Sequence, residues 1–282
     1  MADAPQLRRP ERDVTLRDAC WTAAFAVVIV TIAQTVTMVA PQTQRAVAPG
    51  DPRFGEVYVE HATVPEWMLL IVALVLPAGI AFAVGIRSRL RRNKFGKAAF
   101  AAACVCLSVA LAMCATDLVK LYVGYPRPHF FARAALGKDA ERKARMSFPS
   151  GHSSSSFAGM LFLSLFLNGE FDLGTSGLPG VPALLGQLVA VLSPVCLALF
   201  VAVSRVHDNH HFPADVVSGA CIGSGCAIAT FFSLFTRATG ASAGTARAQQ
   251  SFKPATYASS EDIHDDGRDM AIHHELSDGP LL

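Results

Sequence analysis

Long apolar runs alternate with short polar segments along the first 236 residues of the chain. A helix that crosses a bilayer needs about 17–25 predominantly apolar residues. Uncharged runs of this length recur six times, at Ala19–Ala40, Trp67–Ile86, Ala98–Thr116, Ser153–Gly169, Val181–Ser204 and Val216–Thr236. The pattern predicts an all-α, polytopic membrane protein, a bundle of about six transmembrane helices. Ser153–Gly169 is the weakest run, because it opens with four serines.

Two features of the runs test this interpretation. Pro77 and Pro194 interrupt two of them, which transmembrane helices tolerate when neighbours satisfy the freed carbonyls. The first run, Ala19–Ala40, is longer than the apolar region of about 7–15 residues in a cleaved signal peptide. We therefore expect it to be a retained first helix.

Composition narrows the function classes. The chain has 282 residues, of which 52% are hydrophobic and 16% charged, whereas soluble domains average about 25% charged. A net charge of +2 gives no reason to expect a nucleic-acid partner. All seven cysteines lie in or at the ends of the predicted spans. They resemble small apolar packing residues rather than a disulfide or zinc framework.

Basic residues set the expected orientation, because Lys and Arg in short loops favour the cytosolic side. They are concentrated before the first run and in the loop after the second, which six spans place on one side. The third loop, with the fifth, would then face outward, yet it carries seven basic residues: Lys120, Arg127, Arg133, Lys138, Arg142, Lys143 and Arg145. Either one span is miscounted or some of these cations bind an anion. The polar fifth loop on the same side favours the second explanation.

The organisation predicted from these patterns has three parts. Residues 1–18 form a cytosolic N-terminal segment and residues 19–236 a six-span core. Residues 237–282, rich in Ala, Ser and Gly and then acidic, form a disordered cytosolic tail. The tail ends in "DGPLL", which resembles an acidic-dileucine sorting signal, although so short a match usually arises by chance.

Three motifs carry the candidate chemistry. "KLYVGYPRP" contains Lys120 and Arg127, "PSGH" ends at His152, and "SRVHDNHHFPAD" contains Arg205, His211 and Asp215. In this order and spacing they resemble the three-part signature of the type 2 phosphatidic acid phosphatase superfamily, in its lipid phosphate phosphatase branch. "TDLVK" and "RPHF" are also similar to eukaryotic lipid phosphatases.

The chain departs from many relatives at two positions. Tyr125 stands where many relatives have an extra Arg, and Asn209 where many have a Tyr. Neither position belongs to the core signature. Both could shift the substrate preference.

The residue types fit cleavage of a phosphomonoester. His211 is the expected nucleophile, Asp215 fixes its tautomer, and His152 protonates the leaving alcohol and then activates water. If His211 and Asp215, four residues apart, lie on a helix, they share a face. The phosphate oxygens would contact Lys120, Arg127, Arg205 and the backbone at Ser150 and Gly151. No metal or other cofactor is expected, because magnesium requires more carboxylates than Asp215 alone.

Simpler explanations exist for single residues. His211 and Asp215 could be a helix-start pair, or could bind zinc with His207, although the surrounding cations oppose a metal. Lys120 could extend toward the membrane surface, with Asp117 as its ion-pair partner. Gly219 and Gly223 indicate close helix packing. We treat His207, Asp208 and His210 as bystanders.

The resemblance implies hydrolysis of phosphatidate or a related lipid phosphate to a diacylglycerol-type alcohol and phosphate, through a phosphohistidine. The expected partners are the lipid phosphate, the bilayer and, through transmembrane helices, another copy of the chain. The site would face the non-cytosolic side of the plasma membrane or an endomembrane. The alternatives are a lipid phospho-headgroup transferase related to sphingolipid synthases, or a catalytically silent interaction protein. A transporter is disfavoured by the scarcity of charge within the spans.

Overall fold

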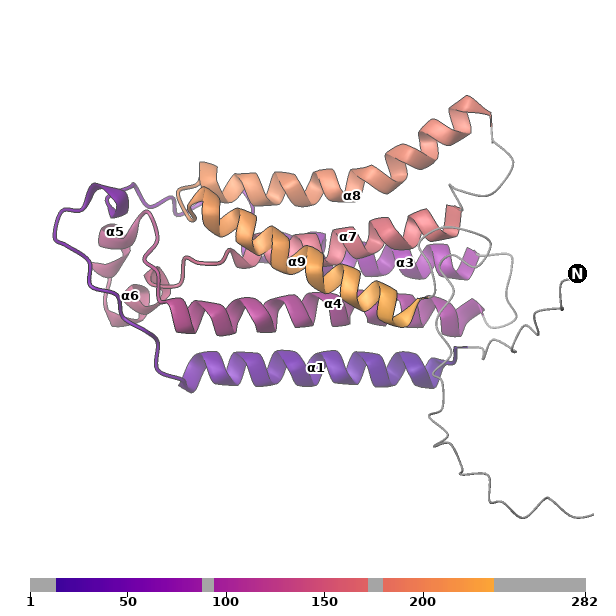
Figure 1. Ribbon diagram of the computed structural model, residues 1–282, viewed down its shortest axis with the longest axis horizontal. Coiled ribbons are helices and arrows are strands. Elements are labelled where there is room, and N and C mark those ends of the chain that lie inside the picture. Colours follow the sequence, from indigo (N-terminus) through magenta and orange to yellow (C-terminus); the bar gives the residue numbers. More distant parts are fainter. Residues whose placement is uncertain (1–13, 88–93, 172–179, 236–282) are drawn as a thin grey trace, which may run out of the picture. The chain divides into compact units, whose positions relative to one another are not determined.

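The computed structural model describes residues 14–87, 94–171 and 180–235, and the regular elements of these residues are helices, with no strand among them (Figure 1). The helices are α1 (Leu16–Val39), α2 (Glu66–Leu70), α3 (Leu76–Arg87), α4 (Lys94–Val123), α5 (Phe130–Ala134), α6 (Lys138–Ala144), α7 (Gly151–Phe171), α8 (Val181–His207) and α9 (Pro213–Leu234). A 3₁₀ turn, η1 (Pro52–Phe54), precedes α2, and a π-helical turn, η2 (Ile71–Val75), joins α2 to α3. The all-α prediction is confirmed, and each predicted span falls on a helix. The tail from residue 237 lies outside the described residues.

Five helical segments are long and apolar enough to cross a membrane. They are α1, the continuous α2–η2–α3 segment, α4, α8 and α9. α7, which contains the weakest predicted span, does not meet the same apolarity criterion. The five segments identify an integral membrane protein, and the surroundings of α7 explain its more polar sequence.

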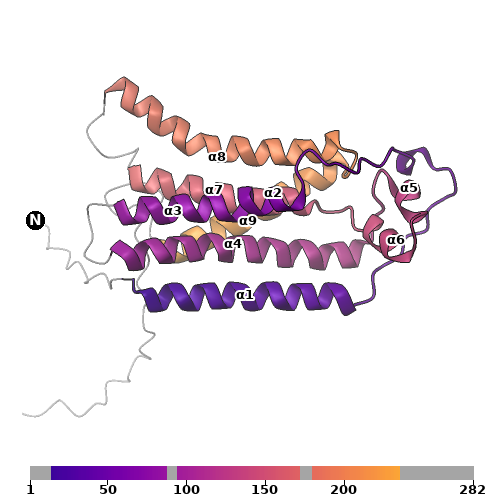
Figure 2. The same cartoon turned by 180° about the vertical axis from the view of Figure 1, so that it is seen from behind.

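α7 lies inside the bundle and packs against α3, α4, α8, α9 and η2 (Figure 2). None of the residues from 151 to 170 is exposed. α1 packs mainly on α4 and exposes large apolar side chains such as Trp21, Phe25 and Ile32. The apolar outer helices therefore provide the surface for lipid, while α7 is surrounded by protein.

Serine hydroxyls of α7 find hydrogen-bond partners on the neighbouring helices. Ser153 donates to the Val216 carbonyl of α9 at 2.7 Å, and Ser164 donates to the Val191 carbonyl of α8 at 2.6 Å. Val191 lies in the turn before Pro194, which has no N–H of its own to donate. The Ser164 hydroxyl therefore ties α7 to the turn of α8 that precedes Pro194, and α8 continues through this proline.

Glycines allow the backbones of α7 and α9 to approach closely. A Cβ on Gly223 would lie 2.1 Å from the Ser154 carbonyl oxygen, and one on Gly219 would lie 2.4 Å from the Ser150 carbonyl oxygen. No real Cβ fits at such distances. The prediction of close helix packing at Gly219 and Gly223 is confirmed.

The two ends of the bundle differ. One end holds residues 40–65, α5, α6 and the turn between α8 and α9, so the third and fifth loops lie together (Figure 1). The starts of α4 and α8 and the ends of α3 and α7 lie at the opposite end. There the buried side chains of Lys97 and Glu170 form an ion pair between α4 and α7. Six spans place the third and fifth loops at the same end of the bundle, and the structure has this arrangement.

Candidate functional site

The end of the bundle that holds the third and fifth loops contains a cavity of about 780 Å³. Six of the eight predicted site residues line it: Lys120, Arg127, Gly151, His152, Arg205 and His211. They come from the end of α4, the α4–α5 connection, the start of α7, the end of α8 and the turn before α9. Ser150 and Asp215 are buried behind the cavity wall. Folding thus brings together three motifs that are far apart in the sequence.

His211 and Asp215 form the pair expected of an oriented imidazole. His211 Nδ1 lies 3.5 Å from Asp215 Oδ2, and both side chains are almost completely buried. The two residues do not share a helix face, because α9 begins at Pro213, after His211, and only Asp215 lies in its first turn. The contact is longer than a good hydrogen bond, and His211 Nδ1 has no other partner among the described residues.

Asp215 is itself held in place by its neighbours. Its Oδ2 accepts hydrogen bonds from Ser147 Oγ at 2.6 Å and from the Phe212 N–H at 3.0 Å. The Asp215 carbonyl accepts from the Ser150 N–H at 2.9 Å. Ser150 therefore links the start of α7 to α9, and its N–H is already used within the protein.

Burial and the surrounding cations lower the pKa of His211 well below its ordinary value, with burial the larger cause. The imidazole is therefore neutral at physiological pH. Asp215 lies on its Nδ1 side, so Nε2 is the nitrogen available to a substrate. A neutral imidazole with a free Nε2 is the form that can attack phosphorus.

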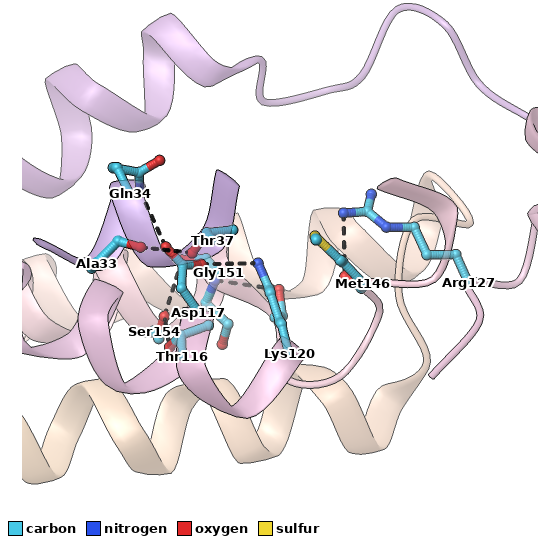
Figure 3. Close-up of polar contacts among 12 residues, drawn as sticks. Ala33, Gln34, Thr37, Thr116, Asp117, Lys120, Arg127, Met146, Gly151 and Ser154 are labelled. Carbon is cyan, nitrogen blue, oxygen red and sulfur yellow. Dashed lines mark hydrogen bonds and ion pairs between the residues drawn. The ribbon is translucent and has the colours of Figure 1, made fainter. Parts of the chain in front are cut away.

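Lys120 lies beside the start of α7 (Figure 3). Its Nζ is 3.8 Å from Asp117 Oδ1, which confirms the expected ion pair, and Gln34 of α1 donates to Asp117 Oδ2 at 3.2 Å. A Cβ on Gly151 would lie 3.0 Å from Lys120 Nζ. Gly151 therefore lets the lysine approach the start of α7 closely.

Arg127 faces the cavity without a carboxylate partner among the described residues. Its Nη2 makes one long contact of 3.5 Å with the Met146 carbonyl, and its buried Nε has no partner in the described part of the chain (Figure 3). Burial, with the nearby Arg133 charge, lowers the pKa of Arg127 to about 10. The guanidinium is still protonated at neutral pH and available to an anion.

Arg205 is held more firmly. Its Nε and Nη2 donate to Ser204 Oγ at 3.1 and 2.9 Å, and Nη2 also donates to Asp208 Oδ2 at 2.9 Å. Asp208 accepts two further hydrogen bonds from Thr63. Our expectation that Asp208 is a bystander is wrong, because it contacts a cavity-lining cation directly.

His210, the second expected bystander, belongs to a cluster on the cavity wall. Its ring lies edge-on to His129 and Tyr58, at centroid distances of 5.1 and 6.0 Å. Burial lowers the pKa of both histidines to about 4, so both are neutral at physiological pH. His129 Nδ1 donates to the Asn209 carbonyl at 2.9 Å. Asn209 has φ 57°, a region in which Asn is enriched.

The third-loop cations have identifiable tasks. Lys120, Arg127, Arg133 and Lys143 line the cavity. Arg142 Nη2 instead donates to the Thr37 and Ala40 carbonyls at the end of α1, at 2.8 and 3.0 Å. These contacts favour the explanation that the basic residues of the third loop bind an anion or stabilise the fold. They give no reason to think that a span was miscounted.

The zinc alternative finds no support in the geometry. His207 is exposed at the end of α8 and does not line the cavity. The described residues contain no group of three or more His, Cys, Asp or Glu side chains placed to hold a metal ion.

Sequence reasoning missed Ser147, Thr63, Tyr58 and the role of Asp208. Ser147 precedes "PSGH" by only two residues, so the only signal was a hydroxyl close to a motif. Thr63 and Tyr58 lie in residues 40–65, whose place over the cavity no local pattern indicates.

The fold and the cavity define a helical, polytopic membrane protein in which four histidines and several cations line one pocket. Residues 101–238 match the family described as the PAP2 superfamily, and this part of the chain is a PAP2 superfamily domain. The match begins within α4, so α1, residues 40–65 and the α2–η2–α3 segment precede it.

Three relatives illustrate the similarity. A PA-phosphatase related-family protein of Dictyostelium discoideum is 37% identical over 61% of this chain and 61% of its own length. Lipid phosphate phosphatase 2 of Arabidopsis thaliana is 36% identical over 61% of this chain and 62% of its own length. Probable diacylglycerol pyrophosphate phosphatase 1 of Schizosaccharomyces pombe is 28% identical over 62% and 66%, respectively. The matched region thus spans about three fifths of the first two relatives. No solved structure matches the chain.

Proposed function

We propose that the protein is an integral membrane lipid phosphate phosphatase that hydrolyses phosphatidate or a related lipid phosphate through a phosphohistidine. The main support is the meeting of His211, backed by Asp215, with His152 and three cations around one cavity. Relatives named as lipid phosphate phosphatases support the same chemistry. The neighbouring apolar helices let the acyl chains remain in the bilayer.

In the first step, His211 Nε2 attacks phosphorus and the bond to the lipid oxygen breaks. Lys120, Arg127 and Arg205 stabilise the charge on the remaining phosphate oxygens. Asp215 accepts the Nδ1 proton in a hydrogen bond and stabilises the positive charge that develops on the ring. His152 supplies a proton to the departing lipid oxygen. The negative phosphate beside His152 favours its protonated form.

In the second step, water attacks the phosphohistidine. His152, left neutral by the first step, removes a proton from this water. The nitrogen–phosphorus bond breaks, and His211 returns to its neutral form as phosphate leaves. His152 regains its proton from the water, so the cycle closes without another reactant.

The test measures phosphate release from phosphatidate in detergent micelles containing EDTA. We expect the parent protein to be active, His211→Ala to have no detectable turnover, and His207→Ala, outside the cavity, to match the parent. Brief reaction with lipid labelled in the phosphate should leave acid-labile, base-stable label on the protein. Label retained by His211→Ala, or loss of parent activity in EDTA that magnesium restores, would exclude this mechanism. Transfer of the label to an added lipid alcohol would instead favour a transferase.

We also propose that the cavity opens on the non-cytosolic side of the membrane. The arginine-rich N-terminus and second loop favour the cytosol, and the cavity lies at the other end of the bundle. Cys replacements at the exposed Lys138 and Lys94, with Cys20, Cys196 and Cys221 changed to Ala, test the proposal on sealed vesicles of known orientation. An impermeant maleimide applied from the non-cytosolic side should label position 138 and not 94. The reverse pattern would place the chemistry in the cytosol.

A further inference from the structure

We infer that Asp208 is a positioning residue, whose carboxylate fixes the Arg205 guanidinium at the cavity and ties down the segment that covers it. This segment, residues 40–65, is called the roof segment here, because Tyr58, Glu60, His61, Ala62 and Val64 of it line the cavity. The inference rests on the proposed function, in which Arg205 contacts the substrate phosphate.

The carboxylate of Asp208 is buried, with 3% of its side chain exposed, and both of its oxygens are used. Oδ2 accepts from Arg205 Nη2 and from the Thr63 N–H, each at 2.9 Å, and Oδ1 accepts from Thr63 Oγ1 at 2.6 Å. One buried charge therefore connects the end of α8 with the roof segment. Hydrogen bonds to an ionised group are short and strong, so this connection holds both partners firmly.

The same contact sets the orientation of Arg205. Ser204 Oγ accepts from Nε and Nη2 of Arg205, and Asp208 accepts from Nη2. Nη1 is left without a hydrogen bond to another described residue. A long arginine side chain otherwise samples many rotamers. Holding it before the anion arrives lowers the entropy lost on binding and places the charge where it is needed.

The roof segment has further attachments away from Asp208. Arg133 Nη1 donates to Tyr58 Oη at 2.7 Å, and the Glu56 N–H donates to the Pro128 carbonyl at 3.0 Å. Thr63, two residues before Pro65 and the start of α2, is held by Asp208. Loss of the Asp208 contact should therefore loosen the part of the roof nearest α2 while the rest stays attached.

Two variants separate the two contacts of Asp208. Thr63→Val removes the hydroxyl but keeps the backbone N–H and the side-chain shape. Asp208→Asn keeps the shape and an acceptor oxygen but removes the charge that faces Arg205. The control is Asp51→Asn, because Asp51 also pairs with an arginine, Arg53, but at the surface and outside this cavity.

Vanadate binding to the purified protein, measured by calorimetry, reports the phosphate site without requiring turnover. We expect Asp208→Asn to weaken vanadate binding about tenfold or more and to raise the KM for phosphatidate similarly. Thr63→Val should have a smaller effect of the same sign, with kcat within about twofold of the parent, and Asp51→Asn should match the parent. The changes in vanadate affinity and KM count only for variants whose unfolding temperature stays near that of the parent, because such variants are still folded.

A cysteine placed at Val64, which is 1% exposed, reports the roof. With Cys20, Cys196 and Cys221 changed to Ala, maleimide should label this position faster when Thr63 is Val than when it is Thr. Unchanged vanadate binding and KM in folded Asp208→Asn protein would overturn the inference and leave Asp208 a structural residue. A parent that binds vanadate but releases no phosphate from lipids would instead contradict the proposed function.

Discussion

α7 and α1 relate to their surroundings in opposite ways. α1 is apolar, yet only 11% of its most apolar stretch is buried within the protein. α7 carries four consecutive serines, Ser153–Ser156, near its start and exposes none of residues 151–170. In a bilayer the apolar surface already has a favourable solvent. The helix buried in the bundle is therefore α7, which has small side chains and hydroxyls for close packing and carries site residues. The difference shows that in this chain polarity, not apolarity, identifies the central helix.

The largest expected effect compares His152 of α7 with Gln34 of α1, since both line the cavity. His152→Ala should lower turnover by about 10²–10⁴-fold, because it removes a proton donor from the reaction. Gln34→Ala removes one hydrogen bond to Asp117, so its loss should stay below about tenfold. Phosphate release from phosphatidate measures both variants. Equal losses would mean that α1 contributes directly to the chemistry.

The next effect concerns how closely helices can approach α7. Gly223→Ala forces a Cβ against the Ser154 carbonyl and should destabilise the protein by about 1–3 kcal/mol. Gly225→Ala is the matched control, because its Cβ would have no atom within 4 Å. That variant should be neutral or gain up to about 1 kcal/mol of helix propensity. Unfolding temperatures in detergent decide between them, and similar values would contradict tight α7–α9 packing.

The smallest effect compares two hydroxyls. Thr116 Oγ1 donates to Ser154 Oγ at 2.8 Å in a buried contact between α4 and α7, so Ser154→Ala should cost about 1 kcal/mol. Thr31 of α1 is exposed and donates to its own helix, to the Val27 carbonyl at 2.9 Å. Thr31→Ala should change the unfolding temperature very little. A larger loss for Thr31 than for Ser154 would reverse the assignment of inner and outer helices.

Local pattern was enough to predict the six helices, because the need for apolar length acts on each span separately. Boundaries were less accurate: α4 begins at Lys94 and ends at Val123, beyond both limits of Ala98–Thr116. Lys97 extends the helix because it is buried against Glu170, a partner distant in sequence. The π-helical turn η2 and the short helices α5 and α6 have no periodic signal long enough to read.

For the site, motif spacing named six of the residues that line the cavity, but it did not name Tyr58 or the residues that support the six. Ser147 contacts Asp215, and Asp208 contacts both Arg205 and Thr63. Such tertiary contacts leave no pattern in a sequence. The spacing of His211 and Asp215 also fitted a helix, but His211 precedes α9, so the shared helix face does not form. Tertiary contacts decided each of these cases.

The Lys97–Glu170 ion pair has a mechanical consequence. It joins α4 to α7 at the end of the bundle opposite the cavity, while Thr116 and Ser154 join the same helices near it. Two fixed points prevent sliding, so α4 and α7 form a rigid strut across the bilayer. When membrane thickness changes, the outer helices α1 and α8 should tilt to adapt. The spacing between Lys120 and His152 should then stay constant in thin and thick membranes alike.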